Sequence, residues 1–426
     1  MRKQSDPIRL RTVLLGTGER LPILCSAVTG EPLYEPLLYS LTEMRAANNA
    51  FNTLRQALRA IKLLHLVLAE LELDLSARLA RGQSLTLAEV EAVARAASLA
   101  MSELTDEDEP VTTAKAVRLE SARARSRPQP LEEVGPGTKA IRLHYIRHYL
   151  NWRATCALLK ADPHSSVFSA LREASEVVSR AIGERIPKVG NRNVEGAREG
   201  LAPDEKARLM QAIVVDGVEN PWKGAHNRVR NNLMVRWYLS CGVRRAELLN
   251  VRITDIDFQT CEVLIARRPD DIDDPRIEQP LVKTTDRMFP VDPTLAKDTH
   301  AYVLNQRRAI RGARRHPYLF VASGTGRPLS LSAVNLLFEQ LRTVGGLPAD
   351  LTPHVMRHSW NDAFSDLADK QGFSAETEQK IRSRVMGWSE TSKSAALYTR
   401  RHVRRKSKEA LLAMQKKLAN GGTDEA

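Results

Sequence analysis

Four side chains in the C-terminal half of this 426-residue chain suit chemistry on a phosphodiester. Arg244 lies in the tract of residues 241–248, His354 and Arg357 stand three positions apart, and Tyr398 follows Arg357 by 41 positions. A phosphodiester in reaction carries negative charge on its non-bridging oxygens, and a planar guanidinium offers paired donors that match them. The set therefore predicts a phosphate clamp of two arginines and a histidine, with the tyrosine oxygen as nucleophile.

The spacing around Arg244 predicts how its side chain is held. Glu247 lies at i+3, which places its carboxylate within reach of the Arg244 guanidinium on a helical turn, whereas Arg245 points elsewhere. Standing alone, the pair would be read as an ordinary surface ion pair.

Two further side chains stand near these tracts. Lys283 lies in residues 281–287, at the turn between two predicted strands, where its ammonium is a mobile proton donor. Trp388 follows Met386 and Gly387, and its indole N–H donates a hydrogen bond but cannot exchange protons, so packing is an equally good role for it. The Tyr398 phenol has an ordinary pKa near 10 and must lose its proton during attack.

These tracts resemble the tyrosine recombinase family, which contains the phage integrases and the Xer and Cre recombinases, over roughly the C-terminal half of the chain. Residues 242–248 are similar to the first arginine box of the family, and residues 354–357 to its His-x-x-Arg box. The resemblance implies attack by Tyr398 to give a 3′-phosphotyrosyl bond, without ATP, metal or other cofactor. It implies these roles: Arg244 and Arg357 bind phosphate, His354 handles protons, Lys283 protonates the leaving 5′ oxygen, Trp388 buttresses the site, and Glu247 and His358 support it.

Composition points to the same kind of partner. The formal net charge is +13 and the pI is near 9.7, which favours a polyanion, with double-stranded DNA ahead of an anionic membrane surface. No apolar run is long enough to span a bilayer and no signal peptide is evident, so we expect a cytoplasmic protein, nucleoid-associated when it binds DNA. The four scattered cysteines are expected to be reduced, with Cys241 a packing residue.

The N-terminal half has the patterns of a small hairpin followed by helices. Short β-prone runs and turn signals over residues 9–38 predict a hairpin or arm, and apolar residues recur with the helical period from Leu54 to Leu71. Further helices are predicted over residues 87–101 and from Ile141 towards Ile182. Residues 102–137 change from acidic to basic to proline-rich, which indicates a linker or surface insertion.

The second half combines helices with a small sheet. We predict helices over residues 203–213 and 231–241, three antiparallel strands over 261–266, 280–284 and 287–291, and helices from Leu295 onward, with a basic helix at 400–418. The predicted fold is mainly α with a small antiparallel β-sheet: a helical core-binding domain and a mixed α/β catalytic domain. The predicted divisions are an arm at 1–38, the core-binding domain at 39–182, a linker at 183–202 and the catalytic domain at 203–426. Within the first half, four basic residues are candidate DNA contacts: Arg142, Arg147, Lys188 and Arg192.

These features predict a site-specific DNA recombinase that integrates, excises or resolves a mobile element. We expect a homo-tetramer on synapsed DNA and a monomer or dimer when free, with DNA-bending proteins or a partner recombinase as candidate accessory proteins. Two alternatives stay open: a type IB topoisomerase-like enzyme, and a non-catalytic DNA-binding regulator on the same fold.

Three weaker patterns are interpreted as structural or solvent-exposed features, not as functional sites. The acidic residues 270–274 are expected to be a solvated insertion, His144 and His148 an exposed helix face, and residues 323–326 a turn.

Overall fold

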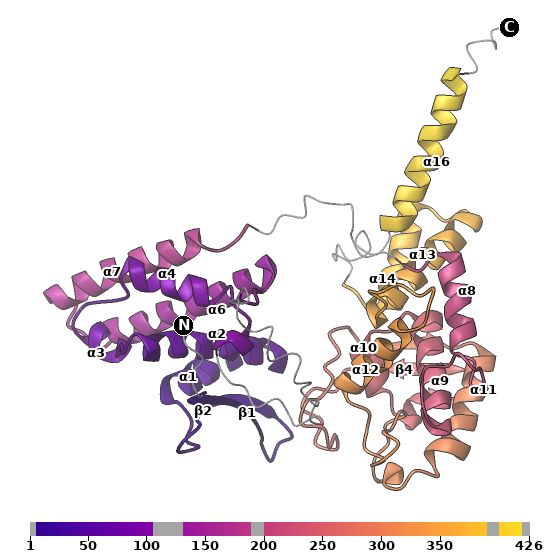
Figure 1. The fold of residues 1–426 in the computed structure, drawn as a ribbon, viewed down its shortest axis with the longest axis horizontal. Coiled ribbons are helices and arrows are strands. Elements are labelled where there is room, and N and C mark those ends of the chain that lie inside the picture. Colours follow the sequence, from indigo (N-terminus) through magenta and orange to yellow (C-terminus); the bar gives the residue numbers. More distant parts are fainter. Residues whose placement is uncertain (1–5, 105–130, 189–199, 390–399, 420–426) are drawn as a thin grey trace, which may run out of the picture. The chain divides into compact units, whose positions relative to one another are not determined.

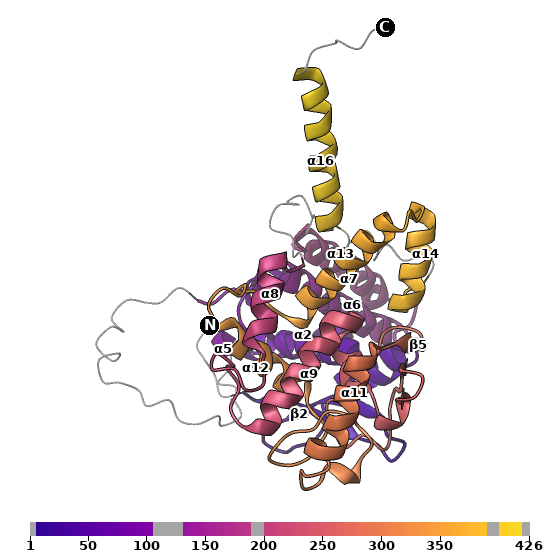
Figure 2. The ribbon, with the colours of Figure 1, turned by 90° about the vertical axis from the view of Figure 1, so that its right-hand side faces the viewer.

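The computed structural model describes residues 6–104, 131–188, 200–389 and 400–419. The chain divides into two compact units, which are shown in Figure 1 and, turned by 90°, in Figure 2. The first comprises residues 1–15 and 20–192, and the second comprises residues 16–19 and 193–426. Each unit has its own cluster of buried apolar side chains.

The first unit begins with a β-hairpin, which confirms the hairpin predicted in this region. Strand β1 (Ile8–Leu14) pairs antiparallel with β2 (Arg20–Ser26), in a register from Ile8 opposite Ser26 to Leu14 opposite Arg20. β2 contacts the long helix α2, and its Leu24 is fully buried in the core of the unit. The hairpin is therefore part of the packed unit.

The rest of the first unit is helical. Helix α2 places its apolar period inward, with Leu54, Leu58, Ile61 and Leu64 at most 1% exposed, as predicted. α2 packs on α6, which packs on α7. The helices are α1 (Tyr34–Tyr39), a π-helical turn (Ser40–Arg45), α2 (Phe51–Glu70), α3 (Leu75–Ala80), α4 (Leu87–Ala96), α5 (Met101–Leu104), α6 (Pro136–Leu158) and α7 (Ser166–Glu184).

Two long predicted helices are each broken in the structure. The chain leaves α4 after Ala96 because the backbone at Ser98 and Ala100 pairs with the segment around Glu133, including a bridge between Leu99 and Glu133. α6 ends at Leu158 and α7 begins at Ser166, and the connection between them contains Pro163, which has no backbone N–H to continue a helix. Ser165 then caps α7 by accepting a hydrogen bond from the backbone N–H of Phe168.

The second unit contains most of the helices predicted there. α9 and α13 lie against each other in its core, where Trp237, Tyr238 and Met356 are fully buried. Its helices are α8 (Pro203–Ala212), α9 (Ala225–Cys241), α10 (Arg245–Asn250), α11 (Pro293–Ala301), α12 (Leu331–Arg342), α13 (Pro353–Lys370), α14 (Ala375–Met386) and α16 (Arg400–Ala419), with short turns at Ile253–Asp255, Tyr302–Arg307 and Ala313–Arg315. In both views α16, drawn in yellow, extends away from the other helices of this unit.

The sheet of the second unit has three antiparallel strands, as predicted, but one of them lies elsewhere. The order is β3 (Ile256–Asp257), β4 (Glu262–Ile265) and β5 (Arg287–Pro290). The strand predicted over residues 280–284 is wrong: the Pro280 carbonyl accepts a hydrogen bond from the Asn250 side chain, and Val282 is buried without a strand partner among the described residues. The fold class, mainly α with a small antiparallel sheet, is confirmed.

The acidic segment 270–274 is not simply solvated, in contrast to the prediction. Asp271 pairs with Arg252 and accepts a hydrogen bond from the Tyr318 hydroxyl at 2.6 Å. Asp274 is 1% exposed and pairs with Arg276 at 2.8 Å. Asp271 therefore fastens this loop to the unit directly, and Asp274 does so through Arg276, which donates to the carbonyls of Leu249 and Leu329. Across the described helices, none combines the length and the apolar character needed to span a membrane.

Candidate active site

Arg244 stands at the junction of two helices. α9 ends at Cys241, Gly242 adopts a left-handed conformation with φ of +58°, and Arg244 is the residue before the first turn of α10. Its backbone N–H donates to Glu247 Oε2 at 2.9 Å, and its Nη1 donates to Glu247 Oε1 at 3.1 Å. The predicted pairing of Arg244 with Glu247 is confirmed, and Arg245 does turn away, to Asn335.

Glycine is required at position 242 for two reasons. A positive φ is unfavourable for residues with a Cβ, and a Cβ built on Gly242 would lie 2.7 Å from Cγ of Trp360. The Gly242 carbonyl also accepts a hydrogen bond from Arg357 Nη1 at 2.5 Å. The turn that orients Arg244 thus also holds Arg357, which belongs to α13.

Arg357 is almost completely buried, at 1% exposure. Its Nη1 lies 3.9 Å from Glu247 Oε2, and its guanidinium carbon lies 5.5 Å from the centre of the Trp388 ring. Trp388, 8% exposed, follows the end of α14 and therefore meets Arg357 from a third segment. The Arg244 side chain, in contrast, is 28% exposed.

Glu247 is the centre of this arrangement. Its side chain has no exposed surface, and its carboxylate faces Arg244, Arg287 and Arg357. Burial alone would raise the pKa of this carboxyl, but the charges of Arg287 and Arg357, with the backbone N–H of Arg244, outweigh burial and lower the pKa to about 2. Glu247 is therefore ionised at neutral pH and is outnumbered by cations.

Sequence reasoning missed two members of the cluster, Thr284 and Arg287. Arg287 opens β5 and donates from Nη2 to Glu247 Oε2 at 3.0 Å, while the Thr284 hydroxyl donates to Glu247 Oε1 at 2.8 Å. No local spacing pointed to them, because 37 and 40 positions separate them from Glu247. In sequence, Arg287 is an arginine at a strand end beside one acidic residue, Asp286, and such a side chain is expected to be solvated.

On α13, His354 lies one helical turn before Arg357, and His358 directly follows Arg357. His354 is in the first helical turn and exposed, whereas His358 is 7% exposed. Their rings are 5.7 Å apart at 62°. An exposed imidazole next to a helix N-terminus, where backbone N–H groups favour anions, is well placed for an anionic ligand.

Two further predicted residues are Lys283 and Tyr398. Lys283 is exposed in the loop that precedes β5, and its neighbour Thr284 bonds to Glu247, so the backbone beside Lys283 is fixed at the cluster. Tyr398, the predicted nucleophile, lies outside the described residues. The structure thus brings Arg244, Glu247, Arg357 and Trp388 together, and the roles of all the predicted site residues stay predictions.

The predicted DNA contacts of the first unit fall in different environments. Arg142 donates to the carbonyls of Ala97 and Leu99 at 3.1 and 2.6 Å, so it supports the chain after α4. Lys188 is exposed, and Arg192 lies outside the described residues. Arg142 also lines a groove of about 970 Å³ that is rich in basic side chains. These are Arg9, Arg11, Arg55, Arg59, Lys62 and Arg142, with Asp6 paired to Lys62.

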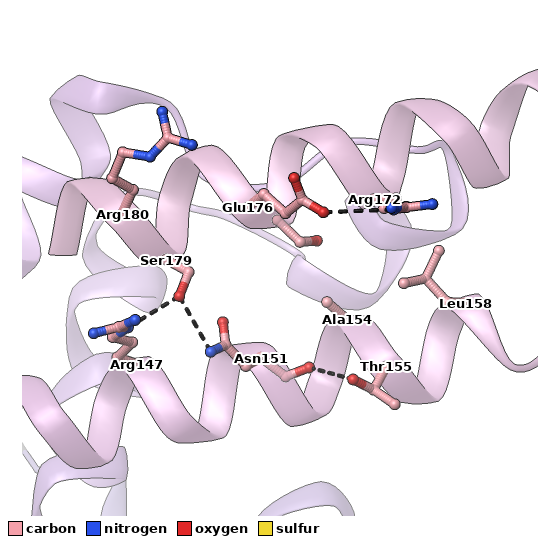
Figure 3. A pocket seen from close by; sticks show the side chains of 10 residues that line it. Arg147, Asn151, Ala154, Thr155, Leu158, Arg172, Glu176, Ser179 and Arg180 are labelled. Carbon is pink, nitrogen blue, oxygen red and sulfur yellow. Dashed lines mark hydrogen bonds and ion pairs between the residues drawn. The ribbon is translucent and has the colours of Figure 1, made fainter. Parts of the chain in front are cut away.

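Arg147 lies in a second hollow, a cleft of about 520 Å³ between α6 and α7 (Figure 3). Its Nε donates to the Ser179 hydroxyl at 3.0 Å, which also accepts from the Asn151 side chain at 3.2 Å. Arg172 and Arg180 line the same cleft from α7, and Arg172 pairs with Glu176. Most residues that line the cleft have polar side chains, and its three arginines outnumber the one glutamate.

The remaining chemically active side chains have structural settings. All four cysteines are free, and burial raises the pKa of the Cys241 thiol to about 12, in keeping with a packing residue. His144 and His148 are exposed on α6. Within the described parts of the chain, no group of three or more His, Cys, Asp or Glu side chains is placed to hold a metal ion.

The second unit thus combines helices, a small sheet and a cluster of arginines around one carboxylate, and its sequence can be compared with known families. Residues 200–405 match the phage integrase family. This region of the chain therefore belongs to that family, which confirms the resemblance seen in the sequence. The match includes Arg244, His354, Arg357 and Tyr398 within its bounds.

Curated relatives are tyrosine recombinases. XerC of Proteus mirabilis is 23% identical over 225 residues, covering 53% of this chain and 58% of the relative. XerC of Alcanivorax borkumensis is 28% identical over 178 residues, covering 38% of this chain and 53% of the relative. The chain thus spans between half and three fifths of the length of these relatives.

Solved structures of similar proteins include a Tn1549 transposon integrase fragment in complex with transposon right end DNA. That match covers 88% of this chain and all of the other, with a TM-score of 0.45 and 13% identity. The XerH site-specific recombinase bound to difH substrate covers 76% of this chain and 85% of its own, with a TM-score of 0.37 and 14% identity.

Proposed function

We propose that this protein is a site-specific DNA recombinase that cuts and rejoins DNA through a 3′-phosphotyrosyl intermediate, for integration, excision or resolution of a mobile element. The single observation that carries the proposal is the cluster in which one ionised carboxylate, Glu247, orients two arginines from distant segments, Arg244 and Arg357. The family membership of residues 200–405 and the Xer relatives support the same conclusion.

The chemistry follows from the charges. One carboxylate faces three guanidinium groups, so the cluster keeps a positive surplus that a phosphodiester would neutralise. Arg244 is exposed enough to receive a non-bridging oxygen, whereas Arg357 must become accessible to DNA for a direct contact. The Arg244 guanidinium is held in advance by Glu247, so it stabilises the charge that develops at the phosphorus without reorganising.

In the proposed strand transfer, one phosphorus–oxygen bond forms for each one that breaks. The Tyr398 oxygen forms a bond to phosphorus as the bond from phosphorus to the 5′ oxygen breaks, and the phenolic proton passes to His354 or the surrounding solvent. Lys283 gives a proton to the departing 5′ oxygen. The 3′-phosphotyrosyl bond retains the energy of the phosphodiester, so attack by a 5′ hydroxyl rejoins DNA without ATP.

The first unit supports the assignment of double-stranded DNA as partner. Its groove presents six basic side chains from β1, α2 and α6 against one acidic residue, Asp6. A surface of this charge binds phosphates by releasing their counterions. We propose that this groove, Arg147 and Lys188 contact the DNA backbone, and that the active assembly is a homo-tetramer on synapsed DNA.

Two other functions fit the structure less well. A type IB topoisomerase-like enzyme would use similar residues, but a separate helical unit with its own basic groove favours a recombinase. A non-catalytic regulator would have no physical need for a buried carboxylate that aligns Arg244 with Arg357.

The test is covalent trapping. Duplexes that the protein binds are first selected from a random pool, and a nick near the bound site then prevents rejoining. We expect the wild-type chain to remain on a 3′ end in denaturant, and Tyr398→Phe to lose this adduct while binding the duplex within a few-fold, since only the nucleophilic oxygen is removed. Adduct formation by the Phe variant at wild-type yield contradicts the assignment of Tyr398.

A further inference from the structure

Arg287 is a buried arginine whose three hydrogen bonds go to three different segments of the candidate site. Its side chain is 7% exposed. Nη2 donates to Glu247 Oε2 at 3.0 Å, Nη1 donates to the Thr284 hydroxyl at 3.1 Å, and Nε donates to the Val385 carbonyl at 2.7 Å. A planar guanidinium has donors on both edges, so one side chain can join three acceptors in this way.

Each acceptor belongs to a segment that carries a candidate catalytic residue. Glu247 holds Arg244 and faces Arg357, Thr284 follows Lys283, and Val385 lies three residues before Trp388. The Thr284 hydroxyl accepts from Arg287 and donates to Glu247, which closes a ring of hydrogen bonds.

The packing around this ring is tight as well. A Cβ on Gly387 would lie 2.9 Å from Arg287 Nη1 and 2.9 Å from the Thr284 Cβ. The end of α14 therefore closes directly on the Arg287–Thr284 contact. A small displacement of Arg287 is transmitted to the segment of Trp388 and to the loop of Lys283.

We propose that Arg287 is a positioning residue for strand transfer, which fixes the Glu247 carboxylate between Arg244 and Arg357 and holds the segments of Lys283 and Trp388 against it. The inference rests on the proposed function and deepens it. Arg287 acts through Glu247 and Thr284, not by touching the DNA.

The charge of Arg287 has a consequence that a purely structural arginine would not have. Arg287 and Arg357 are the main cations that hold the pKa of the Glu247 carboxyl down to about 2 against the effect of burial. Loss of Arg287 removes one of them, so the pKa of Glu247 rises and the carboxyl takes up a proton as the pH falls. A protonated Glu247 no longer attracts both phosphate arginines.

Arg307 provides a matched control in the same unit. It is 4% exposed, and its guanidinium donates only to backbone carbonyls, those of Ala313, His316 and Tyr318, at 2.7 to 3.0 Å. Replacing Arg307 thus removes an equally buried guanidinium without changing the charge at Glu247. Any effect shared by both positions is an effect of lost stability.

The experiment compares Arg287→Gln, Arg287→Lys and Arg307→Gln in the full-length protein, on the nicked duplex used for covalent trapping. Single-turnover adduct formation is measured from about pH 5 to pH 8, with duplex binding and thermal unfolding in parallel. We expect Arg287→Gln to slow adduct formation on the order of 100-fold with binding nearly unchanged, and to lose further rate towards low pH. Arg287→Lys restores the pH profile but not the rate, because an ammonium cannot join all three acceptors.

Arg307→Gln is expected to lower the unfolding temperature while it keeps the wild-type rate and pH profile. The inference is overturned when folded Arg287→Gln reacts with the wild-type rate and pH profile, or when Arg307→Gln shows the same acid-dependent loss. The wild-type protein separates the two proposals. Absence of a wild-type adduct refutes the recombinase function, whereas a wild-type adduct with a normal Arg287→Gln variant refutes only the role of Arg287.

Discussion

At the scale of residues, the site is organised by one negative charge. Glu247 accepts both the backbone N–H and the guanidinium of Arg244, and it lies between Arg287 and Arg357. A buried carboxylate is costly unless cations and hydrogen bonds compensate it, and here they do so in excess. The excess of positive charge is what makes the cluster suited to a phosphate.

This excess predicts that strand cleavage does not depend on a divalent metal. Arg244, Arg357 and Lys283 provide the charge stabilisation that a metal ion would give in a nuclease. We expect covalent adduct formation on the nicked duplex to continue in excess EDTA, without nucleotide. A strict magnesium requirement for cleavage itself, as distinct from DNA binding, would indicate a metal-dependent nuclease.

Local spacing accounts for the residues that could be found from the sequence. The i+3 relation of Arg244 and Glu247 and the placement of His354 and Arg357 on one helix follow from the geometry of a single turn. Arg287 could not be found in this way, because its contact with Glu247 joins residues 40 positions apart. The pairing of Asp274 with Arg276 shows the converse: the two are close in sequence, but only burial of the loop revealed the pairing.

Among the helices and strands, the apolar periodicity of the sequence predicted helices correctly, whereas β-prone composition did not predict which strands pair. The apolar period of α2 and the Pro-Asp-Glu start of α8 correspond to helices in the structure. The strand predicted over residues 280–284 is wrong because these residues have β-prone side chains, although Pro280 has no N–H for a sheet and its carbonyl accepts a hydrogen bond from Asn250. Strand pairing depends on partners that composition does not specify.

The turn between α9 and α10 gives a testable consequence. Gly242→Ala combines a positive φ of +58° with a Cβ placed 2.7 Å from the Trp360 ring, and it disturbs the carbonyl that accepts from Arg357. We expect unfolding free energy to fall by about 1–3 kcal/mol. Adduct formation should also fall by more than this loss of stability explains.

Gly345→Ala is the control for this substitution. Gly345 lies in the same unit, has no positive φ, and has nothing within 4 Å of an added Cβ. The unfolding free energy of both variants is measured by denaturant unfolding, and that of Gly345→Ala is expected to equal the wild-type value. Equal stability of the two variants would mean that the turn at Gly242 tolerates a side chain.

At the scale of the whole molecule, the chain consists of two units with separate cores, and basic side chains occur in both. The groove on the first unit has no catalytic cluster, and the Glu247 cluster lies entirely in the second unit. Binding and chemistry are thus assigned to different parts of the chain. The predicted boundaries at residues 38, 182 and 203 remain predictions, and the assignment of binding to the first unit can be tested by separating the units.

A fragment that begins near Gly200 should bind the selected duplex far more weakly than the full chain. When two modules on one chain bind the same DNA, the second binds at a high effective concentration, so loss of residues 1–199 removes both its contacts and this advantage. Each phosphate contact also releases counterions, so the dependence of affinity on salt should be steeper for the full chain, whose net charge is +13. Gel shifts of both proteins across a salt series measure the two quantities, and circular dichroism verifies that the fragment is folded. Equal affinities and equal salt slopes would mean that the groove formed by β1, α2 and α6 does something other than hold the recombination site.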